Sequence, residues 1–148
     1  MSDYDPPLSM VESATATRCR PTRAAKVFHA IRSGKWRKRI EAIRKLDDPK
    51  KRGAAKKRLP GILWSGLFEK RENNGLVAPS GLICIDLDHL ETPDETRERI
   101  KASPHLWGIF TSPSGDGLKC VFRCPSPPMP HMEVWRIAAA HVKALTRA

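Results

Sequence analysis

The chain has 148 residues, with 27 Lys and Arg against 16 Asp and Glu, which gives a formal net charge of +11. This length suits one ordinary domain, and 40% hydrophobic residues are enough for a packed core, so we do not expect global disorder. No apolar run approaches the roughly 20 residues of a membrane helix, and the acidic start Met1–Pro7 lacks the apolar stretch of a secretory signal. We therefore expect a cytoplasmic protein with no membrane partner.

The positive charge is concentrated in one segment. Residues 18–58 carry 17 Lys and Arg against three Asp and Glu, whereas residues 1–17 carry a net charge of −3 and residues 59–148 are neutral overall. Such a segment is typical of a surface that binds a polyanion, most often nucleic acid. The alternative is a solvated helical face that binds nothing. The side chains expected to contact nucleic acid are Arg37, Lys38, Arg39, Arg44, Lys45, Lys50, Lys51, Arg52, Lys56, Lys57 and Arg58.

The first 22 residues lack hydrophobic periodicity, and we predict a disordered tail. Residues 23–58 are predicted to be a basic helical segment. Its first helix is capped by Thr22 and ends at Gly34, and its second runs from Trp36 to Leu46, where Asp47-Asp48-Pro49 stops it. A further basic stretch, residues 50–58, follows.

From residue 59 onward the pattern becomes that of short strands and helices, and we predict an α+β fold. The last helix is predicted to bury Ile137 and His141 along its apolar side. The Asp116-Gly117 pair predicts a hairpin between the last two strands. In chain order we expect a strand at 62–68, a polar loop at 69–79, a strand at 81–88, a helix at 93–102, strands at 107–111 and 118–123, a proline-rich loop at 125–130, and the final helix.

Four cysteines are expected to be reduced thiols in a cytosolic chain. Cys120 and Cys124, with His131 nearby, suggest zinc only weakly, because their spacing differs from the usual Cys-x2-Cys pair. Both fall on one face of a predicted strand, which favours buried packing instead.

Two acidic residues end the strand predicted at 81–88. Alternation places Asp86 and Asp88 on one face, opposite Ile83, Ile85 and Leu87. Adjacent carboxylates repel each other unless a cation or proton lies between them, and Mg²⁺ or Mn²⁺ prefers such oxygen ligands. A metal held in this way serves phosphoryl and nucleotidyl transfer. The alternative is two exposed acids, one of which caps the following turn.

A glycine-rich turn follows the next strand. Its backbone N–H groups are suited to a phosphate, with hydroxyl donors from Ser112 and Ser114 and a bend at Gly115 and Gly117. Lys119 begins the outgoing strand, where it could contact a triphosphate. The alternative is an ordinary hairpin turn, since the segment is neither a P-loop nor a dinucleotide fingerprint.

Together these motifs resemble a known family. Gly81-Leu-Ile-Cys-Ile-Asp-Leu-Asp-His89 and Phe110-Thr-Ser-Pro-Ser-Gly-Asp-Gly-Leu-Lys119 are similar, in this order, to the N-terminal domain of virulence-protein-E-like proteins, placed in the archaeo-eukaryotic primase superfamily. The resemblance covers residues 24–145 and implies an RRM-like palm at 59–148, in proteins of phages and mobile elements that are often joined to a helicase. It implies that Asp86 and Asp88 are catalytic ligands of Mg²⁺ or Mn²⁺.

The same resemblance implies that Ser112, Ser114, Gly115, Gly117 and Lys119 hold a nucleoside triphosphate on a single-stranded DNA or RNA template. The family's third motif, an aspartate on a later strand, has no counterpart in this chain. The resemblance therefore implies a palm that lacks its C-terminal part.

Three functional hypotheses follow. The first is a primase-polymerase-like nucleotidyltransferase domain, truncated or degenerate. The second is a non-enzymatic, basic nucleic-acid-binding accessory of replication or mobilisation. The third is a haloacid-dehalogenase-like phosphatase, with Asp86 as nucleophile, Asp88 as acid and Lys119 as charge stabiliser.

Overall fold

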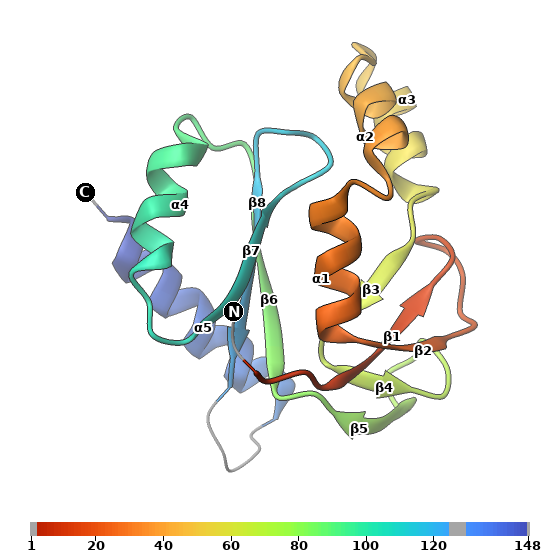
Figure 1. Cartoon of the computed structure of the whole chain (residues 1–148), viewed down its shortest axis with the longest axis vertical. Coiled ribbons are helices and arrows are strands. Elements are labelled where there is room, and N and C mark those ends of the chain that lie inside the picture. Colours follow the sequence, from red (N-terminus) through yellow and green to blue (C-terminus); the bar gives the residue numbers. More distant parts are fainter. Residues whose placement is uncertain (1–2, 125–129, 148) are drawn as a thin grey trace. The chain divides into compact units, whose positions relative to one another are not determined.

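The structure of the chain is a computed structural model that describes residues 3–124 and 130–147. The described residues form an α+β fold with five helices and three small antiparallel sheets (Figure 1). The predicted α+β class is therefore confirmed. The chain divides into two compact units, an N-terminal unit, Asp3–Ser80, and a C-terminal unit, Gly81–Ala148. The division thus falls after Ser80, and not after Arg58 as predicted.

The N-terminal unit contains two small sheets and three helices. Strand β1 is central in the first sheet, whose order is β2–β1–β3, and β4 pairs with β5 in the second; all pairings are antiparallel. The elements are β1 (Pro7–Val11), β2 (Arg20–Arg23), α1 (Ala24–Ser33), α2 (Arg37–Arg44), α3 (Pro49–Lys57), β3 (Gly61–Leu63), β4 (Gly66–Phe68) and β5 (Leu76–Pro79).

The prediction of a disordered tail over residues 1–22 is wrong, because that segment supplies β1 and the start of β2. Leu8 and Val11 are completely buried. The Ser9 hydroxyl accepts a hydrogen bond from the Phe68 amide at 2.8 Å. Ser9 and Phe68 are 59 positions apart in the sequence, and local periodicity carries no signal for such a contact.

Helix α1 begins after Arg23, and no side chain at that position caps it. Thr22, the predicted cap, lies within β2. The cap comes instead from Asp5, whose carboxylate accepts a hydrogen bond from the Ala25 amide at 2.8 Å. The predicted end of the helix is confirmed, since Gly34 adopts a left-handed conformation with φ of 80°.

The basic stretch that follows the second predicted helix is itself helical. Asp48 caps α3 by accepting a hydrogen bond from the Lys50 amide at 2.9 Å, and Pro49 occupies the first turn. Two further differences concern strands. The segment predicted as one strand at 62–68 is split into β3 and β4, and β5 lies inside the predicted polar loop.

In the C-terminal unit, every predicted strand and helix is confirmed to within a residue or two. Its sheet has the order β6–β8–β7, with antiparallel pairing throughout. The proline-rich loop predicted at 125–130 falls mostly outside the described residues. The elements are β6 (Leu82–Leu87), α4 (Pro93–Lys101), β7 (Leu106–Thr111), β8 (Leu118–Arg123) and α5 (His131–Thr146).

Helices α4 and α5 cover one face of this sheet (Figure 1). Ile83 and Ile85 of β6 pack there against Ile100 of α4 and Val142 of α5. The prediction that Ile137 is buried is wrong, because its side chain is 54% exposed. Only a narrow set of positions on the long helix α5 faces the core. A residue at the margin of the apolar stripe therefore remains exposed to solvent.

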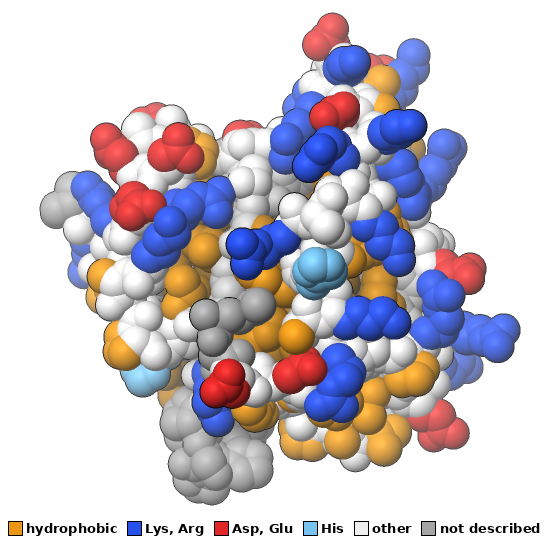
Figure 2. All heavy atoms as spheres, in the orientation of Figure 1, with side chains coloured by type: hydrophobic (Ala, Val, Ile, Leu, Met, Phe, Trp, Pro, Cys, Tyr) orange, Lys and Arg blue, Asp and Glu red, His pale blue; other side chains and the backbone are white. Residues whose placement is uncertain are grey.

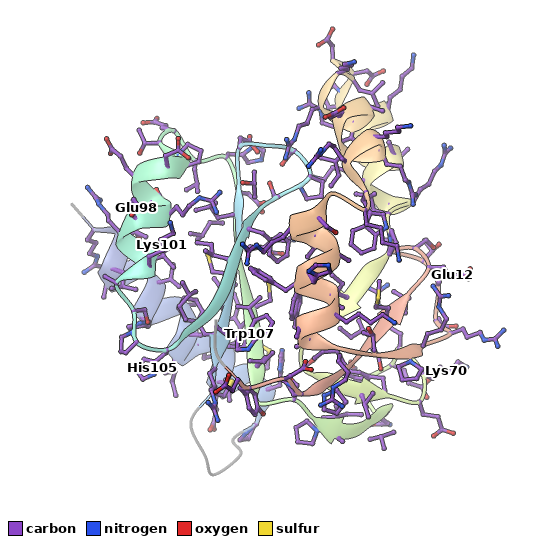
Figure 3. The ribbon with its side chains drawn as sticks, viewed as in Figure 1. Glu12, Lys70, Glu98, Lys101, His105 and Trp107 are labelled. Atoms are coloured by element: carbon purple, nitrogen blue, oxygen red, sulfur yellow. The ribbon has the colours of Figure 1, made fainter. Side chains whose placement is uncertain are left out.

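His141 does lie on the core side of α5, where its Nε2 atom is 2.7 Å from the Ser103 hydroxyl. The same hydroxyl accepts a hydrogen bond from the His105 amide, and the His105 and His141 rings meet edge to face. Figure 3 labels His105 on the segment between α4 and β7. His141 is thus a satisfied, half-buried residue of the core. Among the described residues, no helix has the length and apolar character needed to cross a membrane.

Candidate functional site

Asp86 faces away from the helices and is paired with a lysine. Residues Asp86 and Lys119 are direct partners in the β6–β8 ladder, and Lys119 Nζ donates to Asp86 Oδ1 at 3.0 Å. Their side chains are 53% and 31% exposed. The alternation predicted for this strand is correct, since Ile83 and Ile85 are buried on the opposite face. The lysine already supplies the positive charge that two neighbouring carboxylates would otherwise need.

Asp88 lies one residue beyond β6 and is exposed. No cluster of three or more His, Cys, Asp or Glu side chains able to hold a metal occurs in residues 3–124 and 130–147. Two carboxylates, one of them bound to Lys119, form a poor donor set for Mg²⁺ or Mn²⁺, which bind through several oxygen ligands. The described residues therefore do not fit a divalent metal centre.

The serine–glycine loop is a closed hairpin turn. The Ser112 amide donates to the Gly117 carbonyl at 2.9 Å, and Gly115 has φ of 89°. The Ser112 and Ser114 hydroxyls lie 3.0 Å apart, and Ser114 donates to Asp116 at 2.9 Å. The hydroxyls predicted to hold phosphates are thus engaged with each other and with a carboxylate, which repels an anion.

Asp116 also connects this loop to the end of β6. His89 Nδ1 lies 3.1 Å from Asp116 Oδ2, and the Leu90 amide donates to the Asp116 carbonyl at 2.8 Å. Hydrogen bonds from Ser114 and His89 lower the pKa of Asp116, so that its carboxyl group stays ionised. No local pattern in the sequence points to this pair, because its members are 27 positions apart.

Gly117 is required by close packing at the same place. A Cβ atom there would lie 2.5 Å from the Leu87 carbonyl oxygen and 2.9 Å from the Ser112 hydroxyl. The glycine that was predicted to approach a phosphate approaches the end of β6 instead.

The cysteines are free thiols. Burial raises the pKa of Cys120 to about 12, and burial likewise raises the pKa of Cys84 and Cys124. Cys120 is completely buried in the core of the C-terminal unit, which agrees with packing as its role.

Helices α2 and α3 lie side by side and form what we call the basic hairpin, residues 37–58 (Figure 1). The two helices run antiparallel, since Arg39 of α2 donates to the Arg58 carbonyl just beyond α3 at 2.7 Å. Arg52 of α3 donates through Nε and Nη2 to the Leu46 carbonyl, at 3.0 and 2.7 Å. Two of the eleven predicted nucleic-acid contacts, Arg39 and Arg52, are therefore used to hold the hairpin together.

The lysines of the hairpin differ from Arg39 and Arg52, which contact backbone carbonyls. All six are exposed, and none forms an ion pair with a carboxylate among the described residues. Lys and Arg side chains gather over this part of the molecule in Figure 2. The hairpin carries eleven Lys and Arg against three Asp and Glu, a net charge of +8. The six are Lys38, Lys45, Lys50, Lys51, Lys56 and Lys57.

The fold and this charge distribution define a small α+β protein with a basic helical hairpin in its N-terminal unit. The chain belongs to the family described as BT4734-like, N-terminal domain, whose model matches residues 54–147. The matched segment begins within α3 and includes nearly all of the C-terminal unit. No curated protein and no solved structure matches the chain.

The family match corrects the resemblance drawn from the two motifs. The family found is BT4734-like, N-terminal domain, and not a family of the primase superfamily. The structure offers a physical reason for the error. An Asp-x-Asp strand end followed by a serine–glycine hairpin also arises when an aspartate pairs with a cross-strand lysine and a turn closes on itself.

Proposed function

We propose that this protein binds nucleic acid through the phosphate backbone, with the basic hairpin as the contact surface and without catalysis. The observation that carries the proposal is the set of six exposed hairpin lysines that have no carboxylate partner among the described residues. Like charges held this close repel one another, and binding of a polyanion relieves that repulsion. Phosphate contacts of this kind need no particular base sequence.

Nucleic-acid binding through lysines has a measurable signature. Each phosphate neutralised releases condensed counterions, so the logarithm of the association constant falls linearly with the logarithm of salt concentration, with a slope of about −0.9 per contact. We therefore expect binding that is tight at low salt and weakens steeply as salt is added.

The test compares two variants of equal net charge. The first replaces Lys50, Lys51, Lys56 and Lys57 of α3 with Gln. The matched control replaces Lys70, Arg136, Lys143 and Arg147, which are exposed and lie outside the hairpin, with Gln. Figure 3 labels Lys70 in the N-terminal unit.

Fluorescence anisotropy with a labelled oligonucleotide should show that the α3 variant lowers the salt slope by about 3 to 4 and that the control changes it by less than about 1. Circular dichroism checks that both variants remain folded. Equal weakening in the two variants would contradict the proposal. It would also fail if the unmodified protein bound anionic lipid vesicles more tightly than nucleic acid.

The two enzymatic hypotheses stay predictions. Nucleotidyl transfer and phosphatase chemistry both require the Asp86 carboxylate, and in this structure that carboxylate accepts a hydrogen bond from Lys119. The antiparallel β6–β8 pairing gives the phosphatase hypothesis no doubly wound parallel sheet to rest on. On the proposed function, Asp86→Asn leaves nucleic-acid affinity within about twofold, well under the 1.4 kcal/mol of a tenfold change.

We also propose that the C-terminal unit is RRM-like. Its order β6–α4–β7–β8–α5 corresponds to the first five elements of the β-α-β-β-α-β motif, and β8 lies between β6 and β7. These features support the proposal. An experimental structure of this unit with a further strand tests the RRM-like fold. Pairing of that strand with β6 would support the proposal, and pairing with β7 instead would contradict it.

A further inference from the structure

We propose that α3 docks its exposed face into the major groove of B-form duplex DNA. This inference rests on the proposed function and adds the form of nucleic acid and the surface that meets it. Helix α3 has a glycine, Gly53, in the middle of its exposed length, and the fold itself does not explain it.

Four residues of α3 share one helix face. Lys50, Gly53, Ala54 and Lys57 have the spacing i, i+3, i+4 and i+7, which places side chains above one another on a helix. Ala54 and both lysines are exposed, and no residue of α3 is buried. The face therefore has a lysine at each end and two very small residues between them.

Gly53 is not needed by the fold. Its φ is not in the left-handed region, and a Cβ atom built there would have nothing within 4 Å. Glycine within a helix is nevertheless less favourable than alanine, because its backbone loses more conformational freedom on folding. By contrast, Gly34 has φ of 80° and is required at the end of α1. A glycine that packing does not require suits a place where another molecule approaches the backbone closely.

The dimensions favour a duplex groove. Lys50 and Lys57 are separated by seven residues, or about 10 Å along the helix axis at 1.5 Å per residue. The major groove of B-form DNA is about 12 Å wide and admits an α-helix, with phosphates along both edges. With the helix axis along the groove, the smooth centre of the face can enter it while the lysines at the two ends of the face reach phosphates on the groove edges.

The same dimensions disfavour other forms of nucleic acid. The major groove of A-form RNA is deep and too narrow for side chains to read. Single strands are usually bound by aromatic side chains on which bases stack, and α3 has no aromatic residue. Duplex DNA is therefore the form that this face fits.

The experiment fills the smooth centre of the face without changing its charge. The variants are Gly53→Leu and Ala54→Leu, and the control is Ala140→Leu at an exposed helical position of α5, outside the hairpin. Each protein is titrated by fluorescence anisotropy with a DNA duplex, one of its single strands and the RNA duplex of the same sequence, at one fixed salt concentration. Circular dichroism confirms that helix content is retained.

We expect the unmodified protein to prefer the DNA duplex. Gly53→Leu and Ala54→Leu should each weaken duplex-DNA binding about tenfold, a change of 1.4 kcal/mol, and leave single-strand binding within about twofold. Ala140→Leu should leave all three affinities unchanged. The inference is overturned if single strands or duplex RNA bind more tightly, if the two leucine variants bind duplex DNA normally, or if they weaken all three ligands equally. In each of these cases the salt slope of the α3 lysine variant still decides the proposed function separately.

Discussion

The carboxylate of Asp5 accepts a hydrogen bond from the backbone amide of Ala25 at 2.8 Å, and in this way a residue near the chain start caps a helix twenty positions later. The first turn of α1 has no acidic residue and no side-chain cap of its own. Arg23 pairs with the same carboxylate at 3.1 Å. The N-terminal segment is therefore part of the folded unit.

Replacement of Asp5 should destabilise the N-terminal unit. Asp5→Ala is expected to lower the free energy of unfolding by about 1 kcal/mol, the usual effect of losing a helix cap. Asp3→Ala, at an exposed position of the same segment, is the control and should change little. Urea denaturation of both variants measures the difference. An equal, near-zero effect in the two variants would contradict the capping role.

The same contact predicts a pH dependence. The Ala25 amide, followed by Arg23, lowers the pKa of Asp5 in the folded state. The stabilisation is therefore present above the unfolded-state pKa of about 4 and is lost as the pH falls through the folded-state value. The stability difference between the unmodified protein and Asp5→Ala should shrink between about pH 6 and about pH 3. A difference that grows on acidification would show that the carboxylate is not the stabilising group.

Two glycines of the N-terminal unit should respond in opposite ways to the same substitution. Gly34→Ala places a Cβ atom 2.9 Å from the Arg37 guanidinium at φ of 80°, and we expect a loss of about 1 kcal/mol or more. Gly53→Ala adds a methyl group in open space within a helix, and we expect a gain of about 0.5 to 1 kcal/mol. Thermal denaturation of the pair provides the measurement, and a loss at Gly53 would show packing that the structure does not contain.

The ion pair between Asp86 and Lys119 should contribute little to stability. Exposed pairs of this kind contribute about 0.2 to 1 kcal/mol, because solvent screens the charges. A double-mutant cycle with Asp86→Asn and Lys119→Met, followed by urea denaturation, should give a coupling energy in that range that decreases in high salt. A coupling of several kcal/mol, insensitive to salt, would indicate a buried and functionally tuned pair.

The thiols should differ in reactivity. Burial raises the pKa of Cys120 to about 12 and keeps it protonated, whereas Cys19 is only partly buried. Alkylation of the native protein at about pH 8, where an ordinary thiol is partly ionised, should modify Cys19 well before Cys120. Mass spectrometry of the digested protein measures this order, and denaturant should abolish it. Early modification of Cys120 would mean that the core of the C-terminal unit opens readily.

Much of the C-terminal unit could be predicted from the sequence. The alternation of Ile83, Ile85 and Leu87 with polar residues and the Asp116-Gly117 turn are local signals, and the structure follows both. The N-terminal segment could not be predicted, because β1 is defined by pairing with Arg20–Arg23 and Gly61–Leu63, and not by its own five residues.

The candidate site could likewise be predicted only in part. Net charge along residues 37–58 is additive and can be counted from the sequence. Which cations remain available depends on contacts that the sequence does not reveal, such as that of Arg52 with the Leu46 carbonyl. The partner of Asp86 likewise follows from strand register, which pairs it with Lys119. Without that register, Lys119 is equally suited to contact a triphosphate.

Helix α3 buries no side chain, and its attachment to α2 relies in part on arginine contacts to backbone carbonyls. With so little apolar contact to hold it, this helix should unwind transiently more often than the strands of the C-terminal sheet, and its amide protons should exchange early with deuterated water. A ligand seated on α3 would slow that exchange, so the binding surface can be mapped by mass spectrometry before any substitution is made.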